Sequence, residues 1–317
     1  MLSEPFADIA EKSEIGEDDV LALRQHIYRN DRVDVSDMIA LFELNGTCEV
    51  TVPAWRALYL EAVADYVVRQ ETPLGYISPE NADWLKQNLP ISVSNESLLE
   101  LDALIAVIEE AVSAPLDFQL YVLQMLKSCI LERAQLPGII SADDVDRLRR
   151  TLHARGSQGS LAISREEADV LFDLNDATVE SENDPAWSDL FVKAIANNLM
   201  AARGYRAPMR KEALRQSEWL SEKTEFGSLF SGLLSMSLND LRGAFSKDES
   251  VLASCNQAFE AEGRVAELIE QGEAEWLIGR IDADRQLHEN EKALLRFLKE
   301  ESPRIHPSLK NLLEKVG

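Results

Sequence analysis

The sequence contains few of the residues and motifs that most often carry chemistry. It has three cysteines, Cys48, Cys129 and Cys255, which are far apart and form no CxxC or Cys/His cluster. Neither a disulfide framework nor a zinc site is therefore indicated. The four histidines stand in separate segments, and no HExxH, GxSxG, GxGxxG or GxxxxGK[ST] motif occurs. We therefore expect a non-enzymatic protein without a resident organic cofactor.

Long apolar runs and positive charge are also scarce. No run approaches the roughly 18 apolar residues that a spanning helix needs. The acidic N-terminal segment lacks the basic and apolar regions of a signal peptide. With 32 basic and 56 acidic residues, the formal net charge of −24 repels nucleic acid and anionic membranes. These features predict a cytoplasmic protein that binds neither. The charge itself serves solubility, or attracts a basic protein partner or cations.

One phrase occurs twice in the chain. Residues 41–45 (LFELN) precede 55–63 (WRALYLEAV), and residues 171–175 (LFDLN) precede 187–195 (WSDLFVKAI). The spacing from Trp to the closing apolar pair is identical, and the gap between the two parts differs by two residues. Apolar residues recur at helical spacing in both copies, and long strands are not indicated. The sequence predicts an all-α fold, a tandem duplicated multi-helix bundle of helix–loop–helix units.

Local signals divide this fold further. Pro137-Gly138 is the strongest break in the chain, so the predicted domains are residues 1–136 and 137–317. The second contains extra sequence at about 220–272 that the first lacks. Trp55 and Trp187 are expected to be packing anchors. Asn45-Gly46 is expected to end the first helix of the phrase.

Basic residues gather in 147–155, which holds three arginines near its start. We expect them to form salt bridges with acidic neighbours, and an anionic ligand site is the alternative.

Several predicted helix starts share a junction in which an apolar residue is followed by Ser and then by an acidic residue. Ile163-Ser164, with Glu167 three residues after the serine, is one example and predicts a capping box. The junction resembles the second half of an EF-hand loop, where a carboxylate closes a calcium site. It is also similar to the helical bundle of the tellurite-resistance TerB family, in which acidic residues near a loop hold a metal. The resemblance implies a divalent-cation site at Asp282, Asp284 and Glu291. That stretch spans ten residues without a turn glycine, and helix capping by the same residues is the alternative.

Residues 226–238 combine apolar side chains with Ser and Gly and carry no charge. An exposed apolar segment of this kind has to be covered by a partner, and a buried helix is the alternative. The predicted partner-binding residues are Phe226, Leu229, Phe230, Leu233, Leu234 and Met236. We therefore expect a protein-binding scaffold or adaptor whose partner is another protein or a second copy. The alternative is a divalent-metal-binding, TerB-like stress or regulatory protein.

Overall fold

The computed structural model describes residues 4–48, 50–70, 74–89, 91, 98–154, 163–200, 271–283, 286–301 and 306–316. Within these ranges the chain forms thirteen α-helices. Its only strands there are β1 (Glu14–Ile15) and β2 (Val50–Thr51), which pair in parallel with Glu14 opposite Val50. The predicted all-α class is confirmed. The chain divides into two compact units, unit 1 of residues 1–159 and unit 2 of residues 160–317.

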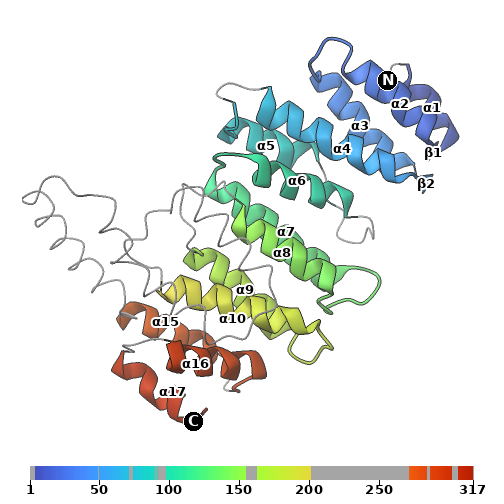
Figure 1. The fold of residues 1–317 in the computed structure, drawn as a ribbon. Coiled ribbons are helices and arrows are strands. Elements are labelled where there is room, and N and C mark those ends of the chain that lie inside the picture. The colour runs from blue at the N-terminus through green and yellow to red at the C-terminus, as the bar shows by residue number, and fades with distance from the viewer. Residues whose placement is uncertain are drawn as a thin grey trace, which may run out of the picture. The chain divides into compact units, whose positions relative to one another are not determined.

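Unit 1 is built around α6, which is buried on nearly every side. Figure 1 shows α6 between α4 and the pair of α7 and α8, and it packs against all three. This position follows from its sequence, because a helix that is apolar on more than one face has to be covered by several neighbours. The helices of unit 1 are α1 (Phe6–Lys12), α2 (Glu17–Ile27), α3 (Val35–Thr47), α4 (Pro53–Ala64), α5 (Pro79–Asn88), α6 (Leu99–Glu110), α7 (Leu116–Glu132) and α8 (Ala142–His153).

A π-helical turn, η1 (Asp65–Arg69), continues α4 and ends at Gln70. The Gln70 side chain bonds to both backbone groups of Val33 in the connection between α2 and α3. Its Oε1 accepts from the Val33 N–H, and its Nε2 donates to the Val33 carbonyl at 3.0 Å. The backbone N–H and carbonyl of the buried Val33 thereby find their hydrogen-bond partners on one side chain.

Helix α8 follows the predicted domain boundary at 136/137 in sequence, but it packs with the helices that precede that boundary. Arg147 of α8 donates to Asp102 of α6 through Nε at 2.8 Å and Nη2 at 3.3 Å. Arg150 makes a similar paired contact with Glu109 of α6, at 2.9 and 2.6 Å. These contacts place α8 in unit 1, so the unit extends well past Gly138, where the chain only turns. They also confirm, for Arg147 and Arg150, the salt bridges expected in the basic stretch.

Unit 2 is smaller in the part that the structure describes. Its α10 packs against α9 and α16, and α16 packs against α17. The predicted capping box at the start of α9 is confirmed, since Ser164 Oγ accepts from Glu167 N at 3.2 Å and Glu167 Oε2 accepts from Ser164 N at 2.8 Å. The helices are α9 (Arg165–Ala177), α10 (Pro185–Met200), α15 (Gln271–Ile281), α16 (Glu289–Glu301), a 3-10 turn η2 (Pro307–Leu309) and α17 (Lys310–Glu314).

Each unit contains a cluster of four aromatic rings, three from corresponding positions of the recurring phrase and one tryptophan from a later helix. In unit 1, Phe42 contacts Tyr59 and Trp84, and Trp55 contacts Tyr59. In unit 2, Phe172 contacts Phe191 and Trp276, and Trp187 contacts Phe191. Ring centroids are 5.7–6.0 Å apart in the first cluster and 5.1–5.8 Å apart in the second. Both tryptophans of the phrase are buried, as expected for packing anchors. The clusters are Phe42, Trp55, Tyr59 and Trp84 in unit 1, and Phe172, Trp187, Phe191 and Trp276 in unit 2.

Candidate ligand-binding site

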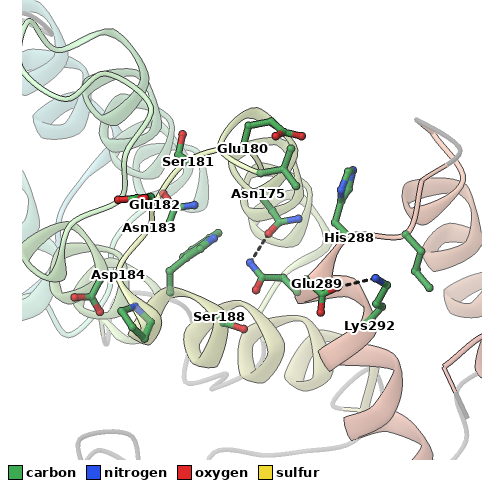
Figure 2. Close-up of a pocket in the computed structure, with 15 residues that line it drawn as sticks. Asn175, Glu180, Ser181, Glu182, Asn183, Asp184, Ser188, His288, Glu289 and Lys292 are labelled. Carbon is green, nitrogen blue, oxygen red and sulfur yellow. Dashed lines mark hydrogen bonds and ion pairs between the residues drawn. The ribbon is translucent and has the colours of Figure 1, made fainter.

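A cavity of about 480 Å³ lies in unit 2 where the connection between α9 and α10 faces the start of α16. Figure 2 shows Asn175 and residues 180–184 on one side of the opening, and His288, Glu289 and Lys292 on the other. The volume falls within the range of sites that bind small molecules or a few side chains.

The α9–α10 connection is held by its own hydrogen bonds. Thr178 ends α9 and donates from Oγ1 to the Leu174 carbonyl at 2.8 Å. Asn183 Nδ2 donates to the Thr178 carbonyl at 2.9 Å, which closes the loop on itself. Asp184 Oδ1 then accepts from the Ala186 amide at 2.8 Å, and Pro185 begins α10. One wall of the cavity is therefore organised before any ligand arrives.

The floor of the cavity contains two buried side chains with unused hydrogen-bond donors. Asn175 is 2% exposed and Trp187 is 1% exposed. Asn175 Oδ1 accepts from Asn290 Nδ2 at 2.8 Å, the bond drawn in Figure 2. Neither Asn175 Nδ2 nor Trp187 Nε1 has a hydrogen-bond partner in the part of the chain that the structure describes. An unsatisfied buried donor costs about 1–3 kcal/mol, so both atoms favour an acceptor that enters the cavity.

Unit 1 contains the same Asn–Trp pair with its donors satisfied. Trp55 Nε1 donates to Asn45 Oδ1 at 3.0 Å, and Asn45 Nδ2 donates to Glu100 Oε1 at 2.6 Å. Glu100 is the second residue of α6, which packs against the Trp-bearing helix α4. In unit 2 the second residue of the helix that packs against α10 is Asn290. Where unit 1 has an acceptor carboxylate, unit 2 thus has an amide that itself donates.

The charged residues that line the cavity are mostly acidic. Its only lysine, Lys292, is paired with Glu289 at 2.6 Å (Figure 2), and this ion pair lowers the pKa of Glu289. The other carboxylates are Glu180, Glu182 and Asp184. Excess negative charge around an opening raises the local concentration of cationic groups.

Of the three residues predicted to bind metal, the structure describes Asp282 and Glu291. Glu291 is buried, and its Oε2 accepts from the His288 amide at 2.8 Å, which caps the start of α16. Asp282 is exposed after the end of α15, and Asp284 lies outside the described residues. Among the residues that are described, no three or more His, Cys, Asp or Glu side chains are arranged to hold a metal ion. The geometry thus supports the capping alternative for Glu291.

The predicted partner-binding residues, from Phe226 to Met236, also lie outside the described part of the chain. No helix of the described ranges is long and apolar enough to cross a membrane. No protein-family model, curated protein or solved structure matches this chain.

Proposed function

We propose that this chain is a non-enzymatic protein-binding scaffold or adaptor, and that the cavity of unit 2 recognises a segment of another protein. The observation that carries this proposal is the pair of unused donors on Asn175 and Trp187. An indole N–H and a carboxamide N–H₂ donate hydrogen bonds but neither titrate near neutral pH nor attack a substrate. They are suited to recognition, and polypeptide backbone carries one carbonyl acceptor per residue.

We also propose that the scaffold arose by duplication of one helical unit. The recurring phrase supports this, because both of its tryptophans occupy the third position of a helix that begins Pro-Ala-Trp, at Pro53 and Pro185. The matching ring contacts of the two aromatic clusters support it as well. The difference at Glu100 and Asn290 then accounts for a unit 1 that satisfies its own donors and a unit 2 that leaves them for a partner.

Site-specific photo-cross-linking tests the proposal. A photoreactive amino acid in place of Ser181 lies on the wall of the cavity, and the same group in place of the exposed Lys299 is a control on α16. We expect the cross-linker at 181 to attach to one defined peptide of a second protein, mapped by mass spectrometry. Attachment at 299 to the same peptide with equal yield, or no attachment at 181, would contradict a partner site at the cavity.

A further inference from the structure

We infer that the cavity of unit 2 takes an uncharged carbonyl group from a positively charged peptide segment. In this arrangement the carbonyl oxygen accepts from Trp187 Nε1 and Asn175 Nδ2, and cationic side chains of the peptide lie against the acidic rim. The inference rests on the proposed function, because it names the chemistry of the segment that the scaffold binds.

The comparison with unit 1 indicates which group is missing. There the Asn–Trp pair ends at an oxygen, Glu100 Oε1, which accepts from Asn45. In unit 2 the corresponding position of α16 carries Asn290, whose Nδ2 already donates to Asn175 Oδ1. The remaining donors of the pair therefore lack an oxygen at the place where the cavity lies. A ligand oxygen in this place gives Asn175 Nδ2 the acceptor that Glu100 gives Asn45 in unit 1, and it also accepts from Trp187 Nε1, whose counterpart Trp55 donates to Asn45.

The rim determines the charge of the ligand. Glu180, Glu182, Asp184 and Glu289 line the opening, against the single Lys292. A ligand carboxylate would approach four carboxylates of which only Glu289 is paired with a cation, Lys292, whereas an amide carbonyl carries no net charge. Lysine or arginine side chains beside that carbonyl gain favourable contacts with the exposed Glu180 and Glu182. A carbonyl between basic residues therefore supplies an acceptor for the two buried donors and positive charge for the acidic rim.

A binding assay on the full chain tests this chemistry directly. Fluorescence polarisation is measured with three sets of labelled peptides of about six residues, one rich in lysine and arginine, one neutral and one rich in aspartate and glutamate. We expect the basic set to bind, and its affinity to fall as salt is raised, since the rim contacts are exposed. Equal binding of the acidic set would overturn the inference.

Two variants test whether the buried donors on the floor of the cavity bind the peptide. Trp187→Phe removes one donor and keeps an aromatic ring, and we expect roughly tenfold weaker binding. Asn290→Glu introduces the residue that unit 1 has at this helix position, and we expect the carboxylate to occupy the acceptor site and abolish peptide binding. Trp55→Phe makes the matched change in unit 1 and is expected to leave the affinity unchanged. Thermal melts identify any variant that fails to fold.

The indole N–H of Trp187, assigned in an NMR spectrum through its loss in Trp187→Phe, gives a readout independent of affinity. We expect this signal to move downfield when a basic peptide binds, because the N–H acquires an acceptor. An unmoved signal, or unchanged binding by Asn290→Glu, would overturn the inference. If no peptide binds while the cross-linker at Ser181 still attaches to a defined partner, the carbonyl inference fails and the proposed function stands. If both experiments fail, both proposals fall.

Discussion

Replacing Asp102 by asparagine should destabilise unit 1 strongly. Asp102 is 1% exposed and accepts from Arg147 at 2.8 Å, and it also pairs with Arg56 at 2.8 Å. Asp102→Asn preserves the shape of the side chain but removes the nearest counter-charge of the Arg147 guanidinium, which is 19% exposed, and leaves the buried Asp144 at 3.9 Å. Breaking a buried ion pair in this way costs about 3–5 kcal/mol. We expect about 3 kcal/mol, the low end, because Arg147 keeps some contact with water.

This loss corresponds to a fall of about 6–12 °C in the melting temperature of a unit of this size. Differential scanning calorimetry of the full chain measures it. Asp146→Asn is the matched control on α8, because Asp146 is 63% exposed and 3.9 Å from Arg149, and such surface pairs contribute at most about 1 kcal/mol. The double variant with Arg147→Met should recover part of the loss. A cost below about 1 kcal/mol for Asp102→Asn would refute the view that this pair holds α8 to α6.

Three further outcomes are expected. A fragment of residues 1–159 should resist limited proteolysis, whereas a fragment of residues 1–136 should be digested rapidly, because it loses α8 and leaves Asp102 without Arg147. If the two fragments were equally resistant, the domain boundary would lie at Pro137 as the sequence predicted. Burial and the nearby Arg149 charge lower the pKa of His153 to about 4, so the unfolded chain binds more protons between about pH 6.5 and pH 4. Stability should fall by up to about 3 kcal/mol across this window as the pH drops, and urea unfolding of His153→Gln should lack that contribution. If Asp282, Asp284 and Glu291 bind a divalent cation, as the alternative function requires, restoring calcium, magnesium or zinc after EDTA treatment should raise the melting temperature, and Glu291→Gln should remove that increase; a melt indifferent to every metal would reject the site.

Much of the fold followed from local patterns in the sequence. The apolar stripe that starts at Trp55 predicts a helix, and α4 covers residues 53–64. The boundary at Pro137-Gly138 did not follow, because a Pro-Gly signal reports a turn and not whether the next helix packs back. That outcome depends on Arg147 reaching Asp102, 45 residues away in sequence.

The candidate site was only partly foreseeable. Trp187 was expected to be buried, and it is. Asn45, the last residue of the first part of the phrase, suggested a helix end at Asn45-Gly46. Instead, α3 continues to Thr47, and the Asn45 side chain bonds to Trp55 and Glu100. In the second copy, Asn175 meets Asn290, 115 residues further along the chain. The signal that was available is the pairing of Asn and Trp in both copies, but a missing acceptor becomes visible only when the distant helix is in place.

The contact between Gln70 and Val33 also protects the chain against pairing with a strand of another molecule. A carboxamide presents an N–H donor beside a carbonyl acceptor, so the Gln70 side chain pairs with Val33 as a single residue of a neighbouring strand would. Both backbone groups of Val33 thus have hydrogen-bond partners within the molecule. A foreign strand that approached this connection would find no free N–H or carbonyl of Val33 on which to begin a sheet, and the protection requires one side chain instead of a third strand.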